Sequence, residues 1–191
     1  MLAQEALLEL PSSVNPSSCT TWQQKSEGPS GMKTKFTSRK SWRAKLEKPQ
    51  EPKVVPVPPK MARFGEGSML IPTPKLVDEL IRRIPKGKLA TGSELRRKLA
   101  SDFSADVTCP LTTGIFVRIA AEAAEEDREQ GRKRITPYWR VVKDDGTFNP
   151  KLPGGPAQQT LNLRDEGFEV STAGKKNHRV VDFANRLIKF K

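Results

Sequence analysis

The sequence is poor in the side chains that build metal centres and disulfide frameworks. Its 191 residues include one histidine, His178, and two cysteines, Cys19 and Cys109. Structural zinc sites use clusters of cysteine and histidine, and small disulfide-bonded domains use several cysteine pairs. The sequence therefore predicts neither kind of scaffold. We expect a protein of a reducing compartment that holds no metal and no other cofactor.

Long apolar runs are also absent. No stretch reaches the length of about 18 apolar residues that a membrane-spanning helix needs. The short apolar stretch 6–10 has no basic residue ahead of it, whereas a secretory signal begins with one. We therefore expect a cytoplasmic protein without a membrane contact, associated with the nucleoid if the chain is bacterial.

Basic residues are abundant but unevenly placed. The net charge is +12, and residues 32–63 hold ten Lys or Arg against two Glu, whereas residues 69–170 hold seventeen basic against fifteen acidic residues. Residues 171–191 add six basic residues against one Asp. A nearly neutral body with cationic ends is typical of a protein that binds a polyanion, although basic ends also serve solubility alone.

The composition divides the chain into four parts. Residues 1–31 are rich in Ser, Pro and Gln, so we expect a disordered leader, which a start codon set too early would also explain. Residues 32–68 are basic and Pro-rich and predict a flexible arm. A single folded domain is expected at 69–170, followed by a basic extension at 171–191.

Helix start signals recur along the chain. In the arm, Ser41 precedes a short amphipathic stretch that either docks on the domain or forms only transiently. In the domain, helices are predicted after Thr73, after Thr91 and after Thr108, the last one running toward Gly131. The far half of this last helix is almost wholly polar, and we expect it to be a solvated surface.

Turn signals predict the remaining elements. Residues 139–142 and 147–148 flank the turn at Asp145–Gly146 and predict a short hairpin, and Gly154–Gly155 precedes a final helix. Helix, turn, helix and ribbon together predict an α+β, mainly helical fold: a single winged helix-turn-helix domain.

A five-residue box carries the most specific signal. Residues 137–141 read Pro-Tyr-Trp-Arg-Val, and a Gly-Gly pair and Glu166–Gly167 follow. From about residue 69 to 170 the chain resembles the DNA-binding domain of the alkylguanine-DNA alkyltransferases and their non-enzymatic alkyltransferase-like relatives. Those families carry Pro-Cys-His-Arg-Val and Pro-Trp-His-Arg-Val, respectively, at the box.

The box also differs from the active enzymes at the residues that do the chemistry. Tyr138 stands where the alkyl-accepting cysteine would be, and a phenol with a pKa near 10 is poorly ionised at neutral pH. Trp139 stands at the histidine and cannot relay a proton, which leaves Glu166 without its relay. The resemblance therefore implies a protein that binds altered bases and is not an enzyme.

The same resemblance implies a pocket for an extruded base. Aromatic rings stack on a base with about 1–3 kcal/mol per stacked base, and adjacent aromatics beside a strand also occur as ordinary core residues. We expect a pocket role for Tyr138 and leave Trp139 open between core and pocket. The expected pocket residues are Pro137, Tyr138, Trp139, Arg140, Gly154, Gly155 and Glu166.

The recognition helix departs from the family pattern. Gly114 stands at the arginine that fills the gap left by the extruded base, and Gly92 stands at a tyrosine of the preceding helix. These small residues either permit close approach to the minor groove or mean that base flipping is lost. Arg118, one turn further on, is either a replacement finger or a solvated residue. Cys109 is expected to be a small buried residue rather than a nucleophile.

We thus expect a DNA-binding protein of DNA repair that recognises alkylated or damaged bases without alkyl transfer. Two alternatives are a generic nucleic-acid-binding module without a base pocket and an alkyltransferase with a non-standard nucleophile. The expected partners are double-stranded DNA, with alkylated guanine as the altered base, and a repair-pathway protein; the chain itself is expected to be a monomer. The residues expected at DNA are Thr91, Ser93, Arg96, Thr112, Thr113, Gly114, Arg118, Lys33, Lys35, Arg39, Lys40 and Arg43.

Overall fold

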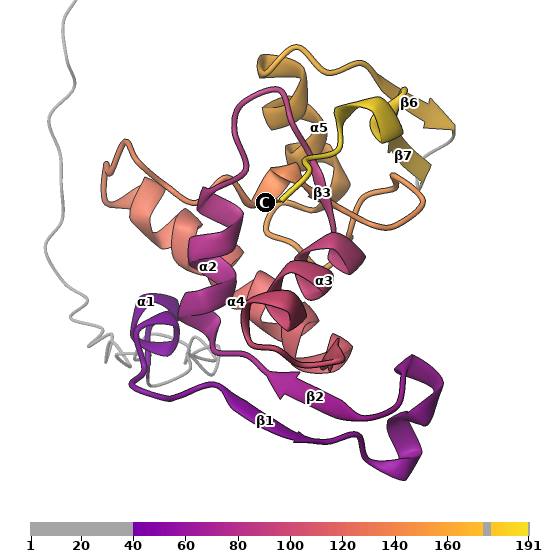
Figure 1. Ribbon diagram of the computed structural model, residues 1–191. Coiled ribbons are helices and arrows are strands. Elements are labelled where there is room, and N and C mark those ends of the chain that lie inside the picture. The colour runs from indigo at the N-terminus through magenta and orange to yellow at the C-terminus, as the bar shows by residue number, and fades with distance from the viewer. Residues whose placement is uncertain (1–39, 174–176, 191) are drawn as a thin grey trace, which may run out of the picture. The chain divides into compact units, whose positions relative to one another are not determined.

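The computed structural model describes residues 40–173 and 177–190 (Figure 1). The predictions for the leader 1–31 and for Lys33, Lys35 and Arg39 lie outside these residues. The described part is α+β, mainly helical, with three small sheets. No helix in it is both long enough and apolar enough to span a membrane.

Three helices form the centre of the fold. They are α2 (Pro74–Arg82), α3 (Gly92–Asp102) and α4 (Pro110–Glu129). Two predicted start signals are confirmed: the Leu76 N–H donates to Thr73 Oγ1 over 3.3 Å, and Thr91 and Glu94 form a reciprocal capping box. The predicted cap at Thr108 is wrong, because Cys109 is the N-cap of α4 and the Thr108 hydroxyl donates to the carbonyl of Arg96.

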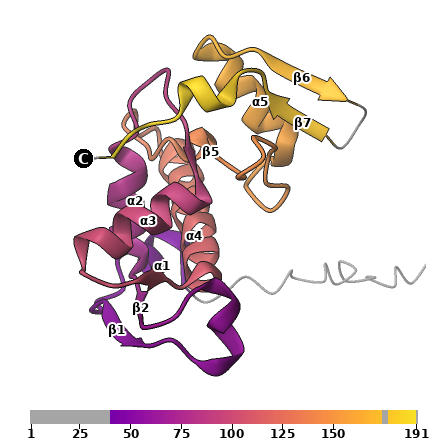
Figure 2. The same ribbon diagram turned by 45° about the vertical axis from the view of Figure 1, so that its right-hand side comes forward.

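Part of the predicted flexible arm is folded in the structure. The short helix α1 (Trp42–Leu46), capped by Ser41, packs against α2 and α4 and buries Leu46 (Figures 1 and 2). Strand β1 (Lys53–Pro56) pairs antiparallel with β2 (Ser68–Ile71). Proline is tolerated on such an edge strand, so the Pro-rich composition that suggested a linker is also compatible with pairing.

The far half of α4 explains why α1 docks. We expected this half to be solvated, but Ala123 and Ala124 are buried and Asp127 is 3% exposed. The Glu126 carboxylate accepts from the backbone N–H groups of Trp42 and Arg43, each over 2.8 Å. A carboxylate stabilises the start of a helix, where backbone N–H groups lack partners. Glu126, which we expected to be solvated, therefore holds α1 in place.

The predicted hairpin around Asp145–Gly146 is wrong in its pairing. Strand β5 (Val141–Val142) pairs in parallel with β3 (Ala90–Thr91). Thr147 and Phe148 instead pair with the C-terminal hairpin, where the Phe148 N–H donates to the carbonyl of His178 over 3.1 Å. The turn itself is present, since Gly146 has φ 79° and its N–H donates to the Lys143 carbonyl. Turn residues reveal a reversal of the chain but not the partner of each strand.

The residues after 150 complete the fold. Helix α5 (Gly155–Asp165) is followed by the antiparallel pair β6 (Val170–Ala173) and β7 (Asn177–Val180). Strand β4 (Val107–Thr108) pairs in parallel with β2. The C-terminal residues lie beside Leu89, whose carbonyl accepts from the Ile188 N–H over 2.8 Å. The remaining elements are the short 3₁₀ helices η1 (Pro59–Phe64), η2 (Tyr138–Arg140) and η3 (Phe183–Arg186).

Two apolar clusters support these elements. The larger one joins α1 to α4 and includes Tyr138, and the smaller one joins β5, α5 and the β6–β7 hairpin. The predicted extension 171–191 therefore contributes to a core, because Val180 is buried in the smaller cluster. The helix-turn-helix order of α3 and α4 is present, while the ribbon predicted as the wing, residues 139–142 and 147–148, does not pair with itself.

Candidate nucleic-acid interface and base cavity

A cavity of about 320 Å³ lies where the starts of α3 and α4 meet β5. This volume falls at the lower end of the range of small-molecule sites. Five residues of α3 and α4 line it: Gly92, Arg96, Thr113, Gly114 and Val117. The other lining residues follow from β5 onward: Val141, Val142, Lys143, Asp144, Asn149 and Leu152. Neither Cys nor His is among the lining residues.

Gly114 lines this cavity and lies on the exposed face of α4. A Cβ built on Gly114 would meet no other atom within 4 Å. Leu111 and Ile115 on the same helical turn are 68% and 50% exposed. A glycine inside a helix costs about 1 kcal/mol relative to alanine. Because no neighbour in the described structure requires a glycine there, the open space is available to a molecule that approaches α4 closely.

The start of α3 is tied to the turn after β5 by a carboxylate. Asp144 accepts from the backbone N–H of Ser93 over 3.1 Å and from its hydroxyl over 2.6 Å. Arg96 donates to the Ser93 hydroxyl over 2.7 Å and lies 3.9 Å from the Asp144 carboxylate. Two residues predicted to contact DNA, Ser93 and Arg96, are thus held by the partly exposed carboxylate of Asp144 at one wall of the cavity.

The pKa of Asp144 reflects this arrangement. Burial alone raises the pKa of the carboxyl, but the hydrogen bonds from Ser93 and the nearby charge of Arg96 outweigh it and lower the pKa below its usual range. A lowered pKa in the folded state means that the carboxylate stabilises the fold above its unfolded pKa of about 3.9 and that this contribution is lost as the pH falls through the lowered value.

Asp144→Ala is expected to destabilise the protein by about 1 kcal/mol at pH 7, since it removes two hydrogen bonds from a partly exposed group. Urea denaturation between pH 3 and pH 7 measures the effect. The difference from the wild-type protein should be full above about pH 5 and shrink toward pH 3. Asp165→Ala, at an exposed position of α5, serves as the control. If the loss in unfolding free energy caused by Asp144→Ala were the same at every pH, the stabilising role of the ionised carboxylate would be contradicted.

The pocket prediction is wrong for Tyr138. Its side chain is 0% exposed, belongs to the larger apolar cluster and donates through its hydroxyl to Glu125 Oε1 over 2.7 Å. Burial, together with this bond to a carboxylate, raises the pKa of the phenol. The ring is therefore a neutral core residue. The sequence pattern identified the box position but not the direction of the side chain.

Arg140 of the box forms a largely buried ion pair with Glu166. Arg140 binds both oxygens of Glu166, over 2.8 to 3.0 Å, and donates to the carbonyl of Ile84 over 2.6 Å. The Trp139 indole N–H donates to the same carboxylate over 2.8 Å. The carboxylate of Glu166 is thus fully engaged, although it lacks the histidine relay of the active family. Trp139 packs against both apolar clusters, and neither it nor the ion pair lines the cavity.

The remaining predicted pocket residues shape the backbone. Pro137 is buried, while Gly154 and Gly155 adopt φ of 66° and 62° before α5. A Cβ on Gly154 would meet Gln158 at 2.5 Å. These residues position α5, whose Gln159 donates to the carbonyls of Trp139 and Val141. None of the seven predicted pocket residues lines the cavity.

The predicted DNA contacts divide into two groups. Arg96, Thr113 and Gly114 line the cavity, although the Thr113 hydroxyl donates to the Cys109 carbonyl. Thr91 is buried as the N-cap of α3. Five described residues of this prediction remain. Ser93 donates to Asp144, and the Thr112 hydroxyl donates to the Cys109 carbonyl. Arg118 is exposed and pairs with Glu122, Lys40 is exposed, and Arg43 binds Asp127.

Several cavity residues were not found from the sequence. Asn149 and Leu152 come from a loop, and Val117 and Val142 read as ordinary core residues. Of these residues, only Asp144 lies in a turn that the sequence predicted. Its contact with Ser93 could not be predicted, because the two residues are 51 positions apart in the chain. Cys109 is buried, as expected, and lies outside this cavity.

Comparison with known proteins identifies two similar structures. No protein-family model and no curated protein matches the chain. Two solved structures from S. pombe do: Atl1 in complex with damaged DNA containing O6-carboxymethylguanine, with 18% identity and a TM-score of 0.43, and ATL in complex with DNA, with 19% identity and a TM-score of 0.46. Each match covers 61% of this chain and 94% of the other. Both neighbours are alkyltransferase-like proteins, the relatives that the box at residues 137–141 resembles.

Proposed function

We propose that the protein binds double-stranded DNA through the first half of α4 and receives an altered base in the cavity beside Gly114, without alkyl transfer. The observation that carries the proposal is the 320 Å³ cavity that opens at a helical position where a Cβ would meet nothing. The damaged base would then be presented to another repair protein. This function belongs to DNA damage recognition and not to catalysis.

The shape of the α4 surface supports binding in a groove. Leu111 and Ile115 are exposed on either side of Gly114, and apolar side chains of this kind enter the minor groove of bent DNA. Arg118 lies one turn further along α4. Its ion pair with Glu122 is a weak surface interaction, so the guanidinium can bind a backbone phosphate instead. The cavity wall offers polar groups of Asn149 and Arg96 to a base edge.

The absence of a nucleophile in the cavity supports binding without transfer. An alkyl acceptor needs an ionisable, accessible group with a base beside it. The cavity lining contains no Cys, His or Tyr, and the buried Tyr138 holds its proton. Cys109 is buried outside the cavity. We expect no lasting mass increase in the protein after incubation with alkylated duplex DNA, as measured by intact-protein mass spectrometry.

Lesion preference tests the proposal. One S. pombe neighbour is a complex with damaged DNA containing O6-carboxymethylguanine, so we choose duplexes with and without an O6-alkylated guanine as probes. Fluorescence anisotropy should give tighter binding of the modified duplex. Equal affinities would favour a generic nucleic-acid-binding module, the reading that the glycine at the arginine-finger position also allows.

Gly114→Leu is expected to reduce the preference for the modified duplex about tenfold or more, because the new side chain fills the cavity mouth. The variant should remain folded, since helix propensity improves by up to about 1 kcal/mol. Gly114→Ala is the matched control, because it gains the same propensity with much less volume and should keep most of the preference. If wild type and Gly114→Leu prefer the modified duplex to the same extent, the altered base does not bind in the cavity beside Gly114.

A further inference from the structure

The loop between β1 and β2 forms a distinct structure on the side of α3 away from β5. It contains η1 and is closed by a hydrogen bond from the Val57 N–H to the Gly67 carbonyl over 2.9 Å. Gly65, with φ 139°, lies so close to β4 that a Cβ would meet Val107 at 2.5 Å. Asp106 accepts from the backbone N–H and the hydroxyl of Ser68 over 2.8 and 2.7 Å. The loop is thus held against the segment that leads into α4.

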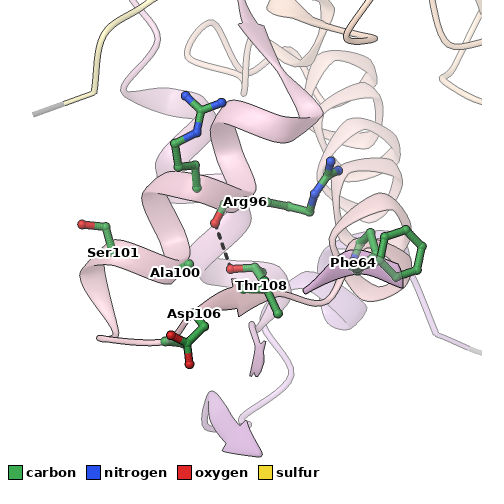
Figure 3. A pocket seen from close by; sticks show the side chains of 10 residues that line it. Phe64, Arg96, Ala100, Ser101, Asp106 and Thr108 are labelled. Carbon is green, nitrogen blue, oxygen red and sulfur yellow. Dashed lines mark hydrogen bonds between the residues drawn. The ribbon is translucent and has the colours of Figure 1, made fainter. Parts of the chain in front are cut away.

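A second cavity, of about 420 Å³, lies between this loop and α3. Figure 3 shows Phe64 at one end of the hollow and Ser101 at the other, with the bond from the Thr108 hydroxyl to the Arg96 carbonyl in between. Pro110, the first residue of α4, also lines it. Arg96 lines both this cavity and the base cavity. A partner that lies along the start of α4 therefore has both hollows within reach.

The rim of the second cavity is basic and carries one exposed aromatic ring. Arg63 lies over the ring of Phe64 at 4.6 Å, and that ring is 42% exposed. Arg97 is exposed, and its side chain has no hydrogen bond or ion pair with any residue that the structure describes. Arg96 also lines the cavity, and Asp106 is the one acidic residue among its lining residues. The Asp106 carboxylate keeps its negative charge, since Ser68 only donates hydrogen bonds to it, but the three arginines Arg63, Arg96 and Arg97 outnumber it on this surface.

We propose that Arg63 and Phe64 of η1 and Arg97 of α3 form a second DNA contact, which binds the phosphodiester backbone of the segment flanking the nucleotide at the base cavity. The proposal rests on the proposed function for the position of the DNA. Exposed guanidinium groups suit phosphates, and an exposed ring at the same rim suits the apolar face of a deoxyribose or an adjacent base. Such a contact increases the affinity for DNA equally for every base sequence, whether or not the duplex carries a modified base.

The double variant Arg63→Ala with Arg97→Ala tests the contact. It should bind modified and unmodified duplexes about tenfold more weakly while their affinity ratio stays unchanged. The slope of log affinity against log salt concentration should decrease by about 1.8, since each lost phosphate contact contributes about 0.9. The matched control is Arg83→Ala with Arg164→Ala, which removes two exposed arginines that do not line this cavity.

Phe64→Ala provides a second readout, because it should weaken binding of both duplexes without changing the salt slope. Equal affinities and slopes for the Arg63/Arg97 variant and its control would overturn the proposal. If the wild-type protein shows no lesion preference but the Arg63/Arg97 variant still shows the loss in affinity and slope, the proposed function fails and the second contact stands. If lesion preference is present and the variant binds like its control, only the second contact fails.

Discussion

Arg140→Ala is expected to destabilise the protein by about 3–5 kcal/mol, the range seen when one partner of a buried ion pair is removed. The side chains of Arg140 and Glu166 are 13% and 8% exposed, and the guanidinium spans Glu166 and the Ile84 carbonyl. Without it, Glu166 keeps a single donor, the Trp139 indole. The link between η2, the end of α2 and the end of α5 would be lost.

Urea denaturation measures this effect against a matched surface pair. Arg118→Ala removes the arginine of an exposed pair with Glu122 and should change the unfolding free energy by less than about 0.5 kcal/mol. Arg140→Lys should be intermediate, since a lysine keeps the charge but cannot bind the carboxylate through two parallel bonds. If Arg140→Ala and Arg118→Ala were equally stable, the ion pair would not have the structural role assigned to it.

Tyr138→Ala is expected to cost about 3–5 kcal/mol, the range for removing a large aromatic side chain from a core. The ring is fully buried and contacts Trp139 edge to face with centroids 5.5 Å apart. Tyr138→Phe keeps the ring and loses only the bond to Glu125, so it should cost about 1 kcal/mol.

DNA binding separates this core role from a pocket role. Tyr138→Phe should keep the preference for alkylated duplex DNA, because the hydroxyl points to Glu125 and not into the base cavity. Thermal unfolding and anisotropy on the same samples provide the comparison. A large loss of lesion preference in a fully stable Tyr138→Phe protein would restore the phenol to the binding site.

Local signals in the sequence identified the helices well. The caps at Thr73 and Thr91 act within one turn, so their residues are adjacent in the sequence and readable there. In the arm, docking of the stretch after Ser41 was one of two alternatives, and the pairing of β1 was not foreseen. Both depend on distant partners: Glu126 binds the start of α1, and β2 pairs with β1. Proline and charge describe a segment alone and do not reveal what it docks on.

The candidate site shows the same limit. The box at residues 137–141 was found from its order, but its side chains point into the core and bind Glu125 and Glu166. The cavity is bounded by Gly114, which the sequence singled out as an anomaly, and by Asn149 and Leu152, which carry no pattern. Gly114 lines the candidate cavity, whereas the side chains of Tyr138, Trp139 and Arg140 do not.

Base extrusion is the most direct test of the proposed cavity. A duplex carrying 2-aminopurine at the target position reports unstacking through its fluorescence, and the cavity lining contains no aromatic ring to stack on the extruded base. We predict that emission rises as the wild-type protein saturates the duplex and does not rise with Gly114→Leu. Saturated binding of the wild-type protein, seen by anisotropy, without a rise in emission would contradict the account.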